Sequence, residues 1–432
     1  MTSIEASTIR KVRLHIVLLL MVCYFAAYLD RVNLSFAALS MNHDLGLSPA
    51  IFGAGAGIFF LGYVLFEVPS NLMLRRFGAR RWFARIMLSW GVISLLFAFV
   101  HNTAGFLGLR FLLGAAEAGF FPGVMLFLTD WLPSAYRGRM VAWFAVALPM
   151  SAALGAPISG WILNLHGALG LHGWQWLFLL EALPSLVLGI VVLRVLADSP
   201  ANARWLEPQE RAWLEQTLAV ERRALPPSSS HGAWHALCNS RVWLLGFIYC
   251  GIVAANYGVS FFLPQIVQAF GVSVSQVGLL SALPFVAGAA GLIWWGARSD
   301  RKRERRWHLM IPGIVAVLAL SAAALTEQPV LRLGALTVAG FGAFASISVF
   351  WTIPAAMLSE TEAPAGFAVL SSIGNVAGFF APFAVGVLKQ MTGTFSSGLL
   401  ALAIFIALTV VVASSVVRPV VRATPDLVKG EA

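Results

Sequence analysis

Two adjacent residues of opposite charge, Asp30 and Arg31, lie inside a long apolar stretch of the sequence. The stretch runs from about residue 14 to about residue 40, which is long enough for a helix to cross a bilayer. A charged side chain in the hydrocarbon core costs about 2.5–3.5 kcal/mol on insertion scales, so it persists where it is paired or faces a cavity. We therefore interpret Asp30 and Arg31 as part of a polar translocation site.

A second pair of ionisable residues, Arg110 and Glu117, lies seven positions apart in another apolar stretch. This spacing predicts one face of a helix, and the four charges sum to zero, which predicts that an empty site is neutralised by internal pairing. A guanidinium offers a carboxylate a two-pronged contact, so Arg31 is predicted to bind a carboxylate substrate. Protonation of Asp30 and Glu117 is predicted to free Arg31 to bind the substrate carboxylate. The alternative is that either pair is a structural ion pair between helices.

Composition predicts a polytopic all-α membrane protein. Of 432 residues, 59% are hydrophobic and 11% are charged, and the mean hydropathy is +0.82; a soluble domain has about 25% charged residues. Continuous apolar runs without alternation favour helices over a barrel. The predicted spans are about 14–40, 51–74, 83–101, 105–131, 139–165, 174–196, 242–269, 275–296, 308–326, 332–358, 364–389 and 395–417.

An internal repeat predicts two halves. Arg80-Arg81-Trp82 recurs as Arg305-Arg306-Trp307, 225 residues later (307 minus 82). The predicted domains are a six-helix bundle over 1–196, a linker over 197–241 with an amphipathic helix, a second six-helix bundle over 242–418, and a tail over 419–432. In transporters built this way the substrate site lies near the midplane between the halves.

The charge distribution predicts orientation. All but four of the 29 Lys and Arg residues fall at the amino terminus, in alternate loops or in the tail; the exceptions are Arg31, Arg110, Arg332 and Lys389. This positive-inside bias predicts that both termini are cytoplasmic, and it accounts for the net charge of +10 without a nucleic-acid partner. The sequence has no P-loop, no metal-ligand cluster and no nucleophile–base set. We expect no cofactor, no metal, no enzymatic activity, and a proton gradient as the energy source.

Further polar residues surround these charges in the first half. Tyr28 shares a helix face with Arg31, and Tyr63 lies one turn from Glu67 in the second span. Tyr28, Tyr63 and Arg110 are predicted to contact the substrate. Glu67 is interpreted either as a residue that tunes substrate choice or coupling, or as a structural acid. Glu181, early in the sixth span, is interpreted as a helix-to-helix contact.

The second half has no ionisable side chain well inside a span, so it is predicted to hydrogen-bond or stack on the body of the substrate. For single serines, packing between helices is the alternative. The residues predicted to make these contacts are Asn256, Tyr257, Ser348, Trp351 and Asn375.

The segment Gly296-Ala297-Arg298-Ser299-Asp300-Arg301 resembles the Gly-x-x-x-Asp-Arg signature of the major facilitator superfamily. Within it, the chain resembles the anion:cation symporters, which include tartrate, phthalate, hydroxyphenylacetate and sugar-acid permeases. The segments that carry this resemblance span most of the chain. They include Tyr28-Leu29-Asp30-Arg31-Val32-Asn33 and Arg110-Phe111-Leu112-Leu113-Gly114 continuing to Glu117-Ala118-Gly119-Phe120-Phe121-Pro122-Gly123.

The resemblance implies that the arginine of the first span holds the substrate carboxylate and that the acids of spans one and four carry protons. It also implies a cytoplasmic gate at Arg76, Asp300 and Arg301. The first-half copy of the signature departs from the pattern, with Asn71 in place of the glycine and Arg75 in place of the aspartate.

We therefore predict a secondary active transporter that takes up a small organic carboxylate with H+ across a bacterial inner membrane, working as a monomer in the bilayer. The alternatives are an organic anion exchanger and a proton-driven efflux transporter. The sequence leaves open whether the substrate is a hydroxy acid, a sugar acid or an aromatic acid.

Overall fold

The computed structural model describes residues 3–224, 239–357 and 363–417. Within these ranges every regular element is a helix. Twelve helical segments of the described chain are long and apolar enough to cross a membrane, which confirms the twelve predicted spans and the all-α class. The predicted tail over 419–432 lies outside the described residues.

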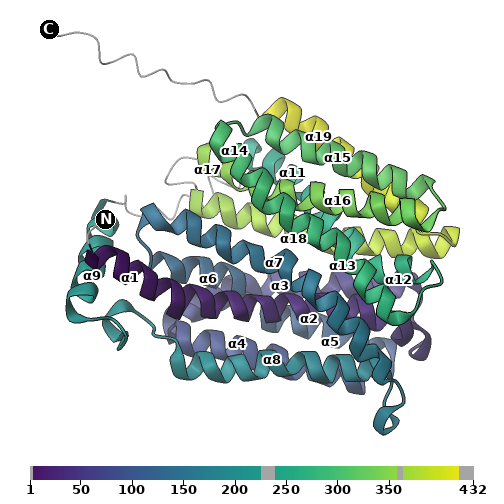
Figure 1. Ribbon diagram of the computed structural model, residues 1–432, viewed down its shortest axis with the longest axis horizontal. Helices are drawn as coiled ribbons and strands as arrows, with labels where there is room; N and C mark the ends of the chain where they lie inside the picture. Colours follow the sequence, from purple (N-terminus) through teal and green to yellow (C-terminus); the bar gives the residue numbers. More distant parts are fainter. Residues whose placement is uncertain (1–2, 225–238, 358–362, 418–432) are drawn as a thin grey trace.

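The first six spans form the lower bundle in Figure 1. Two of them are interrupted, the first by a π-helical turn and the fourth by a two-residue break. The elements are α1 (Ser3–Val12), the π turn Arg13–Val17, α2 (Leu18–Asp44), α3 (Pro49–Phe77), α4 (Ala79–Leu96), α5 (Thr103–Glu117), α6 (Phe120–Thr129), α7 (Ser134–Ile162) and α8 (Gly173–Val195).

The last six spans form the upper bundle. In the sequence, the linker between the two bundles contributes α9 (Pro208–Ala224), where an amphipathic helix is predicted. The remaining elements are α11 (Ser240–Ser260), α12 (Leu263–Gln268), α13 (Val274–Ala290), the π turn Gly291–Trp295, α14 (Gly296–Lys302), α15 (Arg306–Leu325), α16 (Pro329–Phe350), α17 (Thr352–Met357), α18 (Ala363–Thr392) and α19 (Ser396–Val416).

The two bundles meet along two seams, in which α3 packs on α18 and α7 packs on α13. We call the end of the molecule where α1 and α4 begin the basic end, and the opposite end, where α3 and α13 begin, the closed end. At the closed end the backbones of the two bundles touch; the backbone of Gly160 in α7, for example, lies directly against that of Gly278 in α13.

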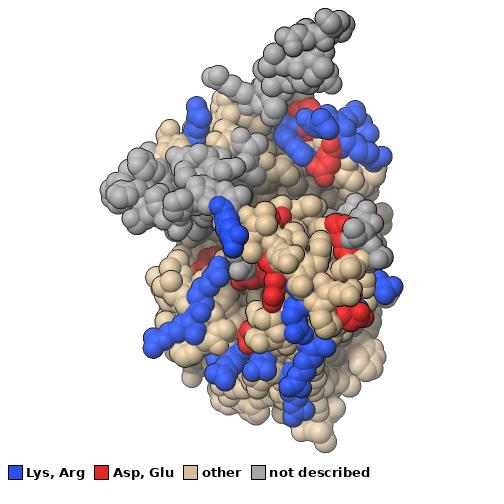
Figure 2. Space-filling view, turned by 90° about the vertical axis from the view of Figure 1, so that its left-hand side faces the viewer, with Lys and Arg blue, Asp and Glu red and all other residues tan. Residues whose placement is uncertain are grey.

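Charged side chains gather at the basic end, over both bundles (Figure 2). They include Arg75 and Arg80 at the turn between α3 and α4, and Arg301 and Arg305 at the turn between α14 and α15. Some pair locally, as Arg305 does with Asp300 at 2.7 Å. The arrangement follows the charge bias of the sequence, which predicts that this end faces the cytoplasm.

The first helix begins earlier than the predicted span, at Ser3 instead of about residue 14. Its polar first turns pack on the linker helix: Lys11 pairs with Glu210 at 2.8 Å, and the Ser7 hydroxyl donates to the same carboxyl at 2.6 Å. The His15 ring stacks on Trp205, with 4.5 Å between ring centroids. The linker is therefore anchored on the first bundle, and this contact keeps the polar residues of α1 helical.

Replacing Glu210 by alanine is expected to release α9 and to destabilise the protein by about 1 kcal/mol. The Glu210 carboxyl also accepts from the backbone N–H of Glu207 at 2.9 Å, so the substitution removes a helix cap as well as the contact with Lys11. Thermal unfolding at pH 7 measures the loss. Glu207→Ala is the matched control, because the side chain of Glu207 is 75% exposed, and it should change stability by half as much or less.

The contribution of Glu210 should also depend on pH. Burial raises the pKa of Glu210, but the hydrogen bonds from Lys11 and Ser7 outweigh it and hold the pKa below its usual range. A carboxyl whose pKa is lower in the folded state stabilises the fold above its unfolded pKa, and this contribution is lost as the pH falls through the folded pKa. The difference between wild type and Glu210→Ala should therefore shrink in acid; a difference that grows in acid would contradict this role.

Candidate functional site

An ion pair between α2 and the end of α5 lies in the interior of the first bundle. Arg31 Nη2 donates to Glu117 Oε1 at 2.5 Å, and 9% of Arg31 and 2% of Glu117 are exposed. Buried charges of opposite sign at this distance stabilise each other, and separating them leaves a charge without a partner. This pair is the direct contact between two of the four charges that the sequence singles out.

Aromatic residues surround the Arg31 guanidinium. Its carbon Cζ lies 5.1 Å from the ring centre of Phe59 and 5.5 Å from that of Tyr63, both on α3. Arg31 Nη1 also donates to the hydroxyl oxygen of Tyr257 on α11, at 3.2 Å. Because Tyr257 belongs to the second bundle, the Arg31 site is built from both halves, as the sequence predicts for Arg31, Tyr63 and Tyr257.

A break in the fourth span places Glu117 at the end of a helix. The next residues, Ala118 and Gly119, leave the helical conformation, and Gly119 has φ of 84°, which favours glycine. A Cβ at Gly119 would also lie 2.4 Å from the hydroxyl oxygen of Ser70. The glycine and proline that follow Glu117 in the sequence therefore stop α5 and begin α6, and the carboxyl of Glu117 lies at the interruption.

Asp30 points away from Arg31, into the first bundle. Its carboxyl accepts from Ser94 on α4 at 3.0 Å and from Ser185 on α8 at 2.8 Å. Adjacent residues on a helix do not face each other, so the neighbours Asp30 and Arg31 reach different partners. The prediction of internal pairing is therefore corrected for Asp30: hydroxyl groups, and not Arg31, are its direct partners in the structure.

Arg110 also has partners other than the predicted Glu117. Its Nε donates to the backbone carbonyl of Gly55 at 2.9 Å and its Nη2 to that of Ala56 at 3.4 Å. The guanidinium lies over the ring of Phe59, at 5.1 Å from the centroid. The side chain thus ties α5 to α3, and its guanidinium, like that of Arg31, lies near the ring of Phe59.

Glu67 lies on α3 near the second bundle. It is buried, its carboxyl comes within interaction range of Ser371 on α18, and its Oε2 has no hydrogen-bond partner among the described residues. Glu67 is therefore placed at the interface between the halves, one turn from Tyr63. This position is compatible with both interpretations of Glu67, a tuning residue and a structural acid.

The remaining residues that are predicted to contact the substrate lie in different environments. Asn256 donates to the carbonyl of Ile252 on its own helix at 3.2 Å, and Ser348 likewise donates to Ala345 at 2.9 Å. Trp351 contacts the Tyr249 ring at 4.8 Å. Two further residues, Tyr28 and Asn375, are respectively buried on α2 and half-buried on α18.

Sequence reasoning missed two aromatic residues in this region, Phe59 and Tyr249. Phe59 lies four positions before Tyr63, on the same face of α3, and touches both buried arginines. Tyr249 lies eight positions before Tyr257 on α11 and packs on Trp351. A search of the predicted spans for aromatics at helical spacing from the polar residues could have found both.

The predicted gate residues lie at the basic end, each within its own half. The Arg76 guanidinium lies over the ring of Phe77 at 5.6 Å, and Asp300 pairs with Arg305. Arg301 Nε donates to the carbonyl of Ala297 at 3.4 Å. These contacts hold the ends of α3 and α14, and a gate role for these residues stays a prediction.

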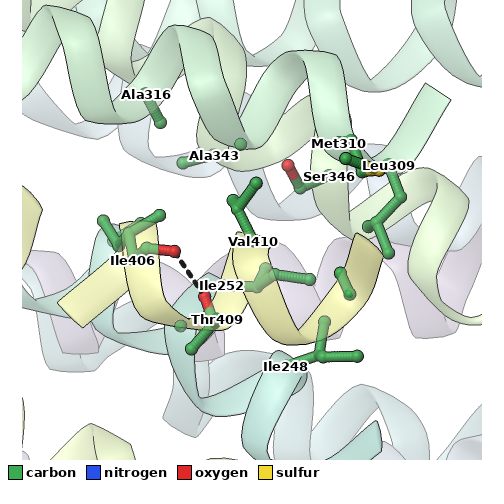
Figure 3. A pocket seen from close by; sticks show the side chains of 14 residues that line it. Ile248, Ile252, Leu309, Met310, Ala316, Ala343, Ser346, Ile406, Thr409 and Val410 are labelled. Carbon is green, nitrogen blue, oxygen red and sulfur yellow. Dashed lines mark hydrogen bonds between the residues drawn. The ribbon is translucent and has the colours of Figure 1, made fainter. Parts of the chain in front are cut away.

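An apolar pocket in the second bundle, between α11, α15, α16 and α19, is separate from the Arg31 site (Figure 3). Its two hydroxyl groups, from Ser346 and Thr409, donate to carbonyls of their own helices, Gly342 and Ile406. Because the hydroxyls are used internally, this pocket offers a carboxylate no cation and no spare donor. We therefore place the candidate site at Arg31 and Glu117.

Comparison with known proteins identifies the family. The sequence matches the family described as the Major Facilitator Superfamily over residues 20–382 and 245–430. The chain belongs to the major facilitator superfamily. This confirms the superfamily that the Gly-x-x-x-Asp-Arg segment indicates. Members are transporters and not enzymes, so the chain is a secondary transporter, a multi-pass protein of a bacterial inner membrane.

The chain is similar to two bacterial proteins in sequence and to a solved structure in fold. A "Putative tartrate transporter" of Agrobacterium vitis is 44% identical over 425 residues, covering 98% of this chain and 97% of that protein. A "Quinolone resistance transporter" of Acinetobacter baumannii is 39% identical, covering 93% and 92%. The solved inward-facing structure of a bacterial homologue of the human lysosomal transporter Spinster superposes with a TM-score of 0.77 at 16% identity, covering 94% and 96%, which bears on the fold alone.

Proposed function

We propose that the chain takes up a small organic carboxylate together with protons by alternating access. The observation that carries the proposal is the pair of Arg31 and Glu117, a buried guanidinium bonded to a buried carboxylate and in contact with Tyr257 of the other half. The similarity to a protein named as a tartrate transporter supports a hydroxy acid as the substrate class.

The chemistry follows from competition for one guanidinium. A substrate carboxylate needs the same donors of Arg31 that Glu117 occupies at 2.5 Å. When Glu117 takes a proton, its charge no longer holds Arg31, and the substrate can replace it with little net change of buried charge. Proton and anion then bind together and cross together. Tyr257 and the rings of Phe59 and Tyr63 would surround the bound substrate.

The rearrangement between the two halves supplies the transport step. Because Arg31 reaches Tyr257 across the interface, a ligand bound at Arg31 contacts both bundles and favours the state in which they are close. Discharge of the proton from Glu117 to the other side of the membrane would restore the ion pair and expel the carboxylate. The basic end, by its charge, would be the cytoplasmic side at which release occurs.

Proton movement on addition of substrate tests the proposal. Proteoliposomes without an imposed gradient are expected to alkalinise the medium when tartrate, galactonate, glucarate, phthalate or 4-hydroxyphenylacetate is the substrate. The signal should vanish in Arg31→Ala and persist in Arg85→Ala, a matched control whose side chain is exposed and lies over Trp82. Proton uptake that persists in the double variant Asp30→Asn, Glu117→Gln would contradict the proposal.

Export of an organic anion is a second candidate, favoured by the relative named for quinolone resistance. It would use the same guanidinium but move substrate and protons in opposite directions. In the experiment above, exchange of this kind gives acidification of the medium when substrate is added outside, so the sign of the pH change separates the two candidates.

A further inference from the structure

A second cluster of buried polar side chains lies in the first bundle, contributed by α2, α4, α7 and α8. It holds two carboxyl groups, those of Asp30 and Glu181, each on a residue only 2% exposed. The other polar side chains of the cluster are three serines and one amide, Ser94, Ser159, Ser185 and Asn33.

Asp30 is well supplied with donors. The hydroxyls of Ser94 and Ser185 donate to its two carboxyl oxygens, at 3.0 and 2.8 Å. The Asn33 amide nitrogen lies 3.5 Å from Oδ1, and the indole of Trp90 also comes within interaction range. Hydrogen bonds from several directions stabilise an ionised carboxylate, so these partners suit Asp30 as the group that can lose its proton.

Glu181 has fewer hydrogen-bond donors than Asp30. Its Oε1 accepts from Ser159 at 2.7 Å, but its Oε2 has no hydrogen-bond partner in the described chain. Asn33 lies within hydrogen-bonding range of Glu181, and the amide oxygen of Asn33, fully buried, also has no partner. Neither Oε2 of Glu181 nor the Asn33 amide oxygen accepts a hydrogen bond from the described residues. A proton on Glu181 would supply a donor that the amide oxygen can accept.

The charges around the cluster also favour a protonated Glu181. The titratable groups that act on the cluster are Asp30 from α2, Glu181 from α8 and, from the end of α5, Glu117, all of them acids. Arg31 follows Asp30 in the chain but bonds to Glu117. Two carboxylates buried together without a cation carry a large desolvation cost in addition to their repulsion. A neutral Glu181 removes the repulsion and its own share of the desolvation cost.

We infer that Glu181 is a positioning residue for proton coupling: a neutral acid that donates to the Asn33 amide oxygen and so aims the Asn33 nitrogen at Asp30. This goes beyond the structural contact that the sequence indicates for Glu181, and it rests on the proposed proton coupling. Asn33 then links the two carboxyls, and the protonation of Asp30 depends on an acid that the substrate never touches.

Infrared spectroscopy of the purified protein tests the protonation directly, without any substrate. Glu181→Gln is expected to remove one protonated-carboxyl C=O band. Ser159→Ala is expected to keep that band and move it to higher frequency, because Ser159 donates to Oε1. Loss of carboxylate absorption in Glu181→Gln, with every protonated band unchanged, would overturn the inference. If Glu181→Gln fails to fold, an unshifted spectrum in Ser159→Ala overturns it equally.

Transport measurements test the positioning role. Glu181→Gln keeps a donor for Asn33 and should leave the pH profile of uptake as in wild type. Glu181→Leu removes it, so Asp30 loses a hydrogen bond to its ionised form, and the pH at which uptake falls should rise by about half to one unit. Equal profiles for the Gln and Leu variants would overturn the positioning role. Absence of any proton-coupled uptake in wild type would instead reject the proposed function and leave the infrared result standing.

Discussion

Transport should fall about 100-fold or more when Arg31 is replaced by alanine, and nearly as far when it is replaced by lysine. Alanine removes the cation that a substrate carboxylate would bind. Lysine keeps the charge but not the planar fork, which in this structure bonds to Glu117 with one nitrogen and to Tyr257 with the other. Initial rates of radiolabelled substrate uptake into proteoliposomes, at equal reconstituted protein, measure the effect.

Stability has to be separated from substrate binding in this experiment. Arg31→Ala leaves Glu117 buried without its partner, which costs about 3–5 kcal/mol if the carboxyl stays ionised. The double variant Arg31→Ala, Glu117→Gln carries no such charge and should recover much of the thermal stability. It should not recover transport. Recovery of transport along with stability would show that Arg31 acts through folding and would contradict a role in binding substrate.

Arg110 provides a comparison within the same bundle. It is as buried as Arg31, but its guanidinium is bonded to the carbonyls of Gly55 and Ala56. Arg110→Gln is therefore expected to affect the packing of α5 on α3 and to lower uptake less than Arg31→Ala does. An equal loss, in a protein of unchanged stability, would return Arg110 to the substrate-binding role that the sequence predicts.

The two charged pairs show how far the sequence could lead. Hydropathy and charge bias suffice for twelve spans because burial of apolar residues and the cost of charge in lipid act on composition alone. The importance of Arg31 and Glu117 also follows from such costs. The hydrogen-bond partners of these charged residues do not follow from such costs, because they depend on how the helices are rotated against each other. Asp30 accepts from serines on α4 and α8, and Arg110 donates to backbone carbonyls of α3.

Contacts between the two halves could not be predicted from the sequence either. Tyr257 is predicted as a substrate contact, yet nothing in a single chain of residues specifies that its hydroxyl meets Arg31. Phe59 was missed because an aromatic residue in an apolar span carries no polar signal. The break after Glu117 could be predicted in part. The glycine and proline that follow Glu117 indicate that the helix is interrupted, but they do not indicate which side chains lie at the interruption.

Replacing Gly160 by tryptophan is expected to hold the two halves apart at the closed end and to abolish transport in a protein that still folds. A Cβ at Gly160 would lie 2.9 Å from the Cα of Gly278 and 3.1 Å from the carbonyl oxygen of Val274, both across the seam between α7 and α13. These are backbone atoms, which cannot turn aside as a side chain can. The bundles can avoid the clash by separating, as alternating access requires them to do in each cycle.

Crosslinking across the other seam measures the separation. Ala50 of α3 and Gln390 of α18 are in contact at the closed end, where the Ala50 N–H donates to the Gln390 side chain at 3.3 Å. With Cys23, Cys238 and Cys250 replaced by serine, the pair Ala50→Cys, Gln390→Cys should form a disulfide readily in the otherwise wild-type protein. In Gly160→Trp its rate of formation should fall about tenfold or more, because the closed state has become the minor one.

Gly108→Trp is the matched control, since a Cβ at Gly108 meets no atom within 4 Å and the residue is exposed on α5. It should leave both crosslinking and uptake as in wild type. Gly160→Trp should also still bind substrate, because Gly160 is not among the residues that contact Arg31 or Glu117 in the described structure. Loss of uptake with an unchanged rate of crosslinking would mean that Gly160→Trp does not hold the bundles apart at the closed end, and it would contradict this prediction.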